Sequence, residues 1–204
     1  MNRRRKFLCL LLIALGVPIG ALAQSPSLAK PASSLQHPLV LKVDPAQSTL
    51  HFSLSATAHT VHGTFAIKSG ELRFGPGAGD AGGQIVADAT SGKTGNDSRD
   101  KNMHSDVLQS ARYPEIVFRL QRVEGSIPAQ GSATVTLIGT FLVHGAEHPL
   151  SIPVQAEITV SHWKGTAAFT VPYVEWGLKN PSNFLLKVSP SVDISLDLSG
   201  TLSQ

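Results

Sequence analysis

The chain has 204 residues, of which 42% are hydrophobic and 15% are charged, and this is a globular composition too short for a large multidomain enzyme. The formal net charge is +3, but residues 1–23 hold four of the 17 Lys and Arg and no Asp or Glu. Taking four from 17 leaves 13 basic against 14 acidic side chains, a net charge of −1. No basic run of the kind that follows a phosphate backbone remains, which argues against nucleic-acid binding.

The N-terminal segment has the three parts of an export signal. Residues 3–6 are basic, residues 7–17 are apolar, and residues 21–23 read Ala-Leu-Ala, a small-x-small cleavage pattern. The apolar part is shorter than the roughly 20 residues that a membrane-spanning helix needs, although an uncleaved anchor is the alternative. We therefore predict a signal peptide over residues 1–23 that directs export by the Sec or the twin-arginine route and is cleaved near Ala23. The mature chain is predicted to be periplasmic.

The mature chain is predicted to hold one domain without disulfides. Its only cysteine, Cys9, lies in the predicted signal peptide, so no disulfide or thiolate ligand remains after cleavage. Residues 24–37 are rich in Ser, Pro, Ala and Gln and are predicted to form a flexible leader. Residues 38–204 are predicted to form the folded domain.

From Leu39 to Leu202 the pattern is typical of β-strands. Apolar and polar residues alternate over residues 50–55, 116–121, 150–160 and 192–199, and Gly- and Pro-rich turns separate the runs. This predicts about eight half-buried strands in an antiparallel barrel or sandwich. Residues 97–108 break the alternation and are predicted to form a short helix, capped by Asp97 or Ser98.

A closed sheet of about eight strands encloses either packed side chains or one small ligand. The inward-facing sets in this chain are aliphatic and aromatic, so we predict a lumen suited to a hydrocarbon. Ordinary core packing is the alternative for each candidate lining residue. The candidates are Phe52, Leu54, Phe118, Leu120, Phe141, Phe169, Leu196 and Leu198.

The histidines raise a metal site as an alternative. His59 and His62 are three residues apart, and His144 and His148 are four apart, spacings that would converge on one ion only in a helix. On an extended strand, side chains three residues apart point to opposite faces. We predict no metal site, and we keep a histidine-dependent metal-binding or stress-response protein as the alternative function.

Catalytic motifs are not evident in the sequence. It has neither the G-x-S-x-G elbow of a hydrolase nor the H-E-x-x-H of a zinc protease. We predict that the protein is not an enzyme and name no catalytic residue. An enzyme that acts on a lipid inside the barrel is a third alternative.

Four groups of segments, taken in order, resemble the YceI-like family of lipid- or polyisoprenoid-binding proteins. The resemblance covers about residues 39–202, nearly the whole predicted mature chain. The segments are residues 48–53 with 58–65 and 70–74, residues 97–105 with 111–118, residues 138–145 with 148–150, and residues 192–200. Residues 172–182 depart from the shorter members of the family and are expected to form a variant connection before the last strand.

The resemblance implies an all-β, extended lipocalin-like barrel of eight antiparallel strands with a short helical segment and a long internal pore. It also implies a ligand with a long isoprenoid tail, such as a polyprenyl phosphate or a quinone, a periplasmic location and often a homodimer. We therefore expect non-catalytic binding of such a lipid for transport or storage, with no cofactor. Transient membrane contact is a further expectation.

Three polar residues of the predicted helix, Arg99, Asp100 and His104, are expected to border the opening, and Arg99 and His104 are the candidates to bind the lipid head group. An arginine suits a phosphate because it forms charge-assisted hydrogen bonds with it. The alternative is that Arg99 and Asp100 form a structural pair. Trp163 and Trp176 are expected to pack on the exterior of the barrel, with a dimer partner or a membrane surface as alternatives.

Overall fold

The computed structural model describes residues 38–57, 59–76 and 80–203, all within one compact unit, Ala32–Gln204. The predicted signal peptide and leader lie outside the described residues. Within the described part of the chain, no helix is long and apolar enough to cross a membrane.

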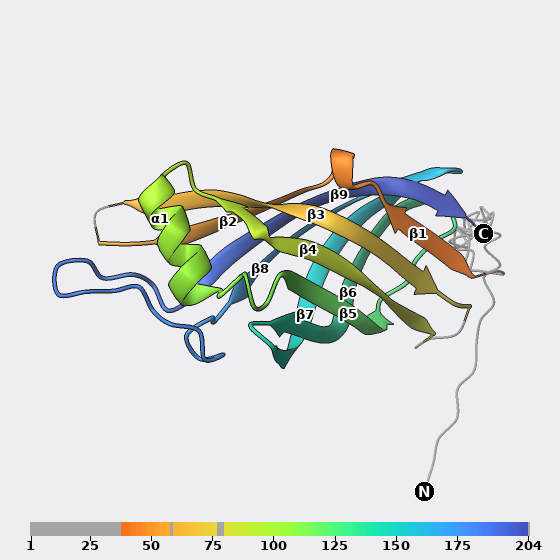
Figure 1. Ribbon diagram of the computed structural model, residues 1–204. Helices are drawn as coiled ribbons and strands as arrows, with labels where there is room; N and C mark the ends of the chain where they lie inside the picture. The colour runs from red at the N-terminus through yellow and green to blue at the C-terminus, as the bar shows by residue number, and fades with distance from the viewer. Residues whose placement is uncertain (1–37, 58, 77–79, 204) are drawn as a thin grey trace, which may run out of the picture. The chain divides into compact units, whose positions relative to one another are not determined.

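One antiparallel sheet of nine strands makes up most of the described chain, and it closes on itself through the pairing of β3 with β4 (Figure 1). The order around the sheet is β1-β3-β2-β9-β8-β7-β6-β5-β4. The predicted all-β barrel is thereby confirmed. The strands are β1 (Leu39–Val43), β2 (Thr49–Ser55), β3 (Thr60–Phe74), β4 (Ala81–Lys93), β5 (Glu115–Glu124), β6 (Gly131–Val143), β7 (Ala146–Ile158), β8 (His162–Val171) and β9 (Val192–Ser203).

The nine strands fill eight positions around the barrel, as predicted, because β1 and β2 share one position. Both strands lie between β3 and β9. β1 pairs with residues 71–74 of β3 and 200–203 of β9, whereas β2 pairs with residues 60–65 of β3 and 193–197 of β9. A short 3-10 turn, η1 (Pro45–Gln47), separates them. Asp44 caps this turn by accepting a hydrogen bond from the Ala46 amide at 2.9 Å.

The predicted short helix is confirmed as α1 (Asp97–Asn102) followed by a π-helical turn, η2 (Met103–Val107). The expected cap was wrong: Asn96 caps α1, and its side chain accepts a hydrogen bond from the Arg99 amide at 3.0 Å. Asn96 is extended, as a capping residue must be, whereas Asp97 already belongs to the helix. The helix lies at one end of the barrel (Figure 1).

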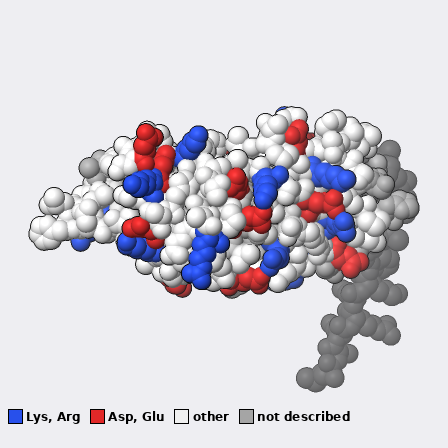
Figure 2. All heavy atoms as spheres, viewed as in Figure 1, with Lys and Arg blue, Asp and Glu red and all other residues white. Residues whose placement is uncertain are grey.

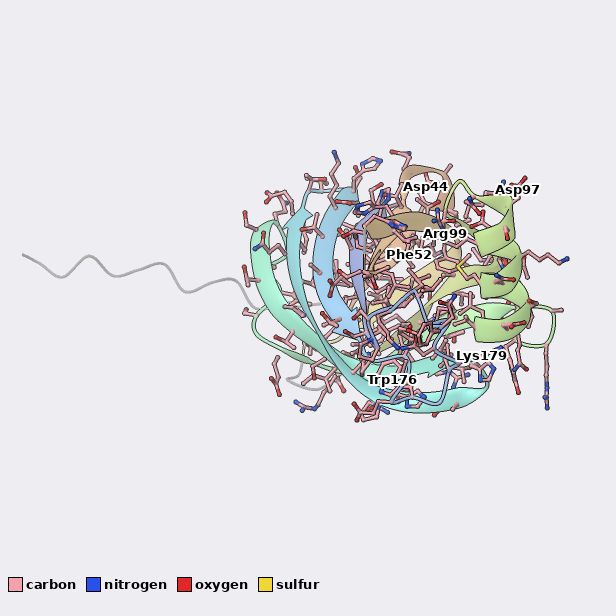
Figure 3. All side chains as sticks on the ribbon, turned by 90° about the vertical axis from the view of Figure 1, so that its left-hand side faces the viewer. Asp44, Phe52, Asp97, Arg99, Trp176 and Lys179 are labelled. Carbon is pink, nitrogen blue, oxygen red and sulfur yellow. The ribbon has the colours of Figure 1, made fainter. Side chains whose placement is uncertain are left out.

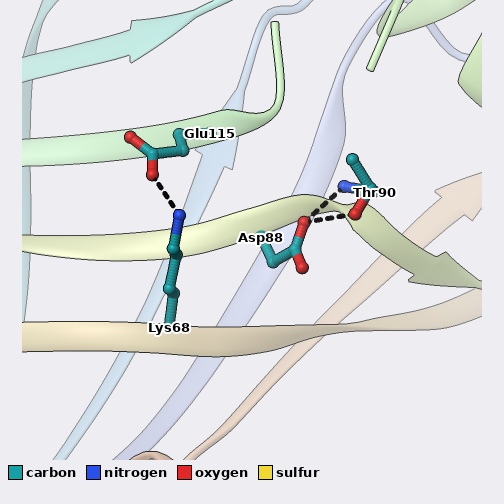
Figure 4. A network of polar contacts seen from close by, with 4 residues as sticks. All are labelled: Lys68, Asp88, Thr90 and Glu115. Carbon is teal, nitrogen blue, oxygen red and sulfur yellow. Dashed lines mark hydrogen bonds and ion pairs between the residues drawn. The ribbon is translucent and has the colours of Figure 1, made fainter. Parts of the chain in front are cut away.

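An irregularity in β4 leads the chain from the sheet toward this helix. The register between β3 and β4 shifts between Thr64 and Ala66, and there the Ala66 amide donates to the Ser91 hydroxyl at 2.8 Å. The Asp88 carboxylate accepts hydrogen bonds from the amide and hydroxyl of Thr90 at 2.8 and 2.6 Å (Figure 4). These bonds lower the pKa of Asp88 below its usual range. Nearby, Lys68 on β3 reaches across β4 to Glu115 on β5 at 2.5 Å.

The lowered pKa of Asp88 predicts a pH dependence of stability. Its contribution is present above the pKa of the unfolded chain and is lost as the pH falls through the lower pKa of the folded state. Replacing Thr90 with Val removes the hydroxyl donor, so the wild type should lose more free energy of unfolding on acidification than T90V does. Chemical denaturation at a series of pH values measures this. An energy difference between the two proteins that is constant with pH would contradict it.

A glycine on β3 makes room for an aromatic ring inside the barrel. Gly63 pairs with Phe52 on β2, and a Cβ on Gly63 would lie 2.3 Å from the Cζ of Phe52 and 2.6 Å from the Lys93 carbonyl oxygen. Phe52 packs in turn on Phe65, with ring centroids 5.3 Å apart. The ring position of Phe52 therefore depends on the missing side chain.

We predict that Gly63→Ala lowers the free energy of unfolding by about 1–3 kcal/mol, because the methyl group overpacks the interior. Gly82→Ala is the matched control, since a Cβ there would have no neighbour within 4 Å. Gly82→Ala should leave stability unchanged or raise it slightly through the unfolded state. Urea denaturation of both variants measures these changes in the free energy of unfolding. Equal changes at the two sites would show that the interior has room for a side chain at Gly63.

Candidate functional site

The barrel interior contains two adjacent apolar cavities of about 450 and 100 Å³. The larger, here the outer cavity, lies at the helix end, and the smaller, the inner cavity, lies deeper in the barrel. Four side chains line both cavities and so stand between them. They are Phe65, Ile116, Phe141 and Ile194, from β3, β5, β6 and β9.

The inner cavity is almost entirely apolar because the alternating strands direct aliphatic and aromatic side chains inward. Trp163 lines it and is 4% exposed, so the expectation that this tryptophan packs on the exterior was wrong. Its indole Nε1 donates to the Lys42 carbonyl oxygen at 3.2 Å, which gives the buried N–H a partner. The remaining lining comes from residues such as Leu72, Ile85, Leu137, Ile152 and Ala167.

The outer cavity has apolar walls and a polar rim. Its walls include Phe52, Leu54, Val61 and Val143 from the strands. Polar residues gather at the helix end and are here called the mouth. Figure 3 views the barrel from this end, with Phe52 inside the ring of strands and Arg99 on α1. The mouth consists of His59, Thr94, Asn96, Ser98, Arg99, Asn102 and Asn183. The cavity is thus amphiphilic, with polar groups at one end only.

Arg99 places a positive charge at the mouth. Its Nε donates to the Thr94 hydroxyl at 2.8 Å, and its Nη2 donates to the Thr94 carbonyl oxygen at 3.1 Å. Thr94 is also bonded to the carboxylate of Asp100 through its amide and hydroxyl. No carboxylate forms an ion pair with Arg99 among the residues that the structure describes. The guanidinium is therefore held in position and still has N–H groups free to meet an anion.

The connection between β8 and β9, residues 172–191, forms part of the cavity wall. Tyr173 and Leu178 are buried against the outer cavity, and the Tyr173 hydroxyl donates to the Ser189 carbonyl oxygen at 2.8 Å. Burial raises the pKa of Tyr173. Lys179 pairs with Asp106 of η2 at 2.7 Å, and this bond lowers the pKa of Asp106. The connection is thus fastened to the helix end of the barrel.

Most of the residues predicted to bind ligand line a cavity, although their role in binding stays a prediction. Leu120 is buried but lines neither cavity. His104 lines neither as well: its Nδ1 contacts the Ser110 hydroxyl at 3.0 Å and its Nε2 the Gly92 carbonyl oxygen at 2.9 Å, so it anchors η2 to β4. Phe52, Leu54 and Arg99 line the outer cavity, Phe118, Phe169, Leu196 and Leu198 the inner cavity, and Phe141 both.

Several lining residues were not among the predicted candidates. Ile116 and Ile194 continue the alternation of Phe118 and Leu196 in the same strands, so the pattern could have identified them. Tyr173 and Leu178 lie in a connection without periodicity. No signal in the sequence places those two residues on the cavity.

The histidines in the described part of the chain have different contact partners. No group of three or more His, Cys, Asp or Glu that could hold a metal is present within residues 38–203, leaving out 58 and 77–79. His62 contacts the Ser53 hydroxyl at 3.1 Å, while His59 lies at the mouth. His148 stacks on Trp176 with centroids 4.3 Å apart, and His144 packs on Tyr113 at 4.7 Å.

The closed eight-position barrel with one short helix places the chain in the lipocalin-like fold class. A family model for the YceI-like domain matches residues 41–200, and the chain belongs to this family. None of the curated proteins compared with the chain matches it.

Solved structures of several proteins share the fold, among them the following three. A polyisoprenoid binding domain from Saccharophagus degradans, implicated in plant cell wall breakdown, has a TM-score of 0.66 and 18% identity, over 80% of this chain and 98% of that domain. BcnA of Burkholderia cenocepacia has a TM-score of 0.64 and 16% identity, over 78% and 99%. The Campylobacter jejuni YceI protein has a TM-score of 0.56 and 16% identity, over 72% and 88%.

Proposed function

We propose that this protein binds an amphiphilic isoprenoid lipid, a polyisoprenoid or an isoprenoid quinone, in the barrel interior without catalysing a reaction. The observation that carries the proposal is the pair of adjacent apolar cavities with one polar mouth. The outer cavity, at about 450 Å³, falls within the roughly 300–1,000 Å³ typical of ligand pockets. Its amphiphilic form matches an apolar tail with a polar head.

The driving force would be burial of the tail. Each CH₂ group taken out of water contributes about 0.8 kcal/mol, part of which is offset by ordering the flexible chain. The tail would enter past Phe52 and reach the inner cavity when the side chains between the two cavities change rotamer. Phe65, Ile116, Phe141 and Ile194 thus act as the internal constriction.

The relatives support this assignment of ligand class. The Saccharophagus degradans protein that shares the fold is a polyisoprenoid binding domain. The predicted signal peptide adds the cellular context, a carrier or store in the periplasm. A homodimer is part of the proposal.

The direct test is native mass spectrometry of the protein purified from a bacterial periplasm, followed by organic extraction. We expect a stoichiometric adduct that extracts as a prenyl lipid, and the same spectrum reports monomer or dimer. A protein that carries no lipid and takes up neither a polyprenyl phosphate nor a quinone would overturn the proposal. An adduct of metal mass that a chelator removes would favour the histidine-dependent alternative.

Filling the inner cavity should shorten the tail that the barrel accepts. Ala167 lines this cavity and is 9% exposed, so Ala167→Leu would occupy much of its volume of about 100 Å³. We expect this variant to keep or gain thermal stability, by about 0.5–2 kcal/mol, while long prenyl chains bind more weakly than short ones. The neighbouring Ala168 is exposed, which makes Ala168→Leu the matched control. Equal tail-length preferences in the two variants would show that the tail does not reach the inner cavity.

Replacing the cation at the mouth should separate charged from neutral head groups. Arg99→Gln is expected to weaken binding of a polyprenyl phosphate by about 10- to 150-fold, because a charge-assisted hydrogen bond contributes about 1.5–3 kcal/mol. Binding of an uncharged quinone should be unchanged. Fluorescence titration with both ligands measures this, and Lys101→Gln on the exposed side of the same helix serves as the control. An equal loss for both ligands would indicate that Arg99 supports the fold instead of meeting the head group.

A further inference from the structure

The connection between β8 and β9 carries an exposed apolar pair at its tip. Phe184 is 94% exposed and Leu185 is 83% exposed. Single apolar residues on a surface are common, but two large adjacent ones at the end of a projecting turn call for a physical reason. The third large hydrophobic exposed in the described part of the chain, Val160, is 75% exposed and lies in the β7–β8 turn at the opposite end of the barrel.

The turn is built so that this pair stays exposed. The Asn183 side chain accepts hydrogen bonds from the amides of Leu185 and Leu186 at 2.9 and 2.8 Å, and the Asn183 amide donates to the Leu186 carbonyl oxygen at 2.8 Å. Such side-chain bonds fix a tight turn locally. At its base, the Lys187 amide donates to the Thr57 hydroxyl at 2.8 Å, and the Thr57 amide donates to the Lys187 carbonyl oxygen at 2.9 Å, which ties the turn to the segment just after β2. Phe184 and Leu185 therefore do not fold back onto the barrel.

The tip lies beside the opening of the outer cavity. Figure 1 shows the connection projecting past the barrel at the same end as α1. Asn183 and Leu186, which flank the exposed pair, both line the outer cavity. A surface that binds Phe184 and Leu185 therefore lies next to the mouth of the outer cavity.

The charges near the tip favour an anionic partner. The segment that carries the turn, residues 176–192, contains Lys179 and Lys187 but no Asp or Glu, whereas α1 and η2 at the same end hold three aspartates, one arginine and one lysine. Figure 2 shows few charged side chains at the corresponding left-hand tip. Lys179 pairs with Asp106, whereas Lys187 forms no ion pair with a described residue. A lysine beside an apolar tip is attracted to the anionic head groups of a bilayer.

We propose that the turn 183–186 inserts Phe184 and Leu185 into the surface of an anionic lipid bilayer, and that this docking sets the mouth at head-group level. The inference deepens the proposed function, because a lipid could then pass between membrane and barrel without crossing water. A second copy of the chain fits this turn less well than a bilayer does. Two side chains present a few hundred Å² of apolar surface, far below the roughly 800 Å² per partner of a standard interface.

The test measures binding of the purified protein to vesicles of phosphatidylcholine with and without phosphatidylglycerol, by flotation. We expect Phe184→Ser and Leu185→Ser each to lower the partition coefficient about tenfold. Val160→Ser, which removes an exposed apolar side chain from the other end of the barrel, should leave the partition coefficient unchanged. Lys187→Gln should weaken binding to the anionic vesicles about fivefold and leave neutral vesicles unaffected.

Other outcomes would overturn the docking role. Vesicle binding that is equal in Phe184→Ser, Val160→Ser and the wild type would exclude the turn as the contact. A dimer seen by sedimentation in the wild type and lost in Phe184→Ser would assign the turn to self-association. Native mass spectrometry separates this inference from the proposed function. If Phe184→Ser keeps the prenyl adduct but loses vesicle binding, both the docking role and the carrier role are supported. If the wild type binds vesicles but carries no adduct, the docking role stands and the carrier role is overturned.

Discussion

Closure of the sheet is the constraint on which the rest of this structure depends. Once β3 pairs with β4, every strand must turn one set of alternating side chains toward a shared interior. Those sets are aliphatic and aromatic, so they pack into a core, yet they leave two cavities unfilled. The same closure removes the sheet edges that would otherwise pair with other chains. The apolar interior is thus at once the source of stability and the candidate binding site.

The two ends of the barrel differ because local interactions at one end prevent the core from closing over. At the helix end, the irregularity in β4 directs the chain outward, and Asn96, Arg99 and Thr94 organise the turn into α1. His104 then fastens η2 to β4, where Gly92 lacks the side chain that would push Met103 away. The helix is held beside the opening, so polar groups collect at one end only. Trp163 occupies the deeper part of the interior.

The connection of residues 172–191 links the cavity to the outside surface. Its first half is buried through Tyr173 and Leu178 and forms a wall, while its second half projects Phe184 and Leu185 into solvent. A single segment therefore shapes the cavity and presents the most exposed apolar side chains among the described residues. Residues 172–182, the first part of this connection, are where the chain was expected to depart from the shorter members of its family. The turn proposed to dock, residues 183–186, follows directly after them.

The sequence by itself determined the fold class and much of the barrel lining. Period-two alternation places Phe52, Phe118 and Leu196 inward wherever their strands pair, because side-chain direction follows from backbone geometry alone. The break in alternation likewise located the helix. The order of the family's segments identified the barrel before any pairing was known.

Only the tertiary structure decided which inward residues face empty space. Leu120 follows the same pattern as Phe118 but packs in the core, and His104 sits in the predicted helix yet anchors it instead of bordering the mouth. Trp163 and Tyr173 reach the cavities through contacts with residues distant in sequence. Alternation fixes the face of a strand, whereas a cavity depends on the summed volumes of side chains from all strands, and that sum exists only after the barrel closes.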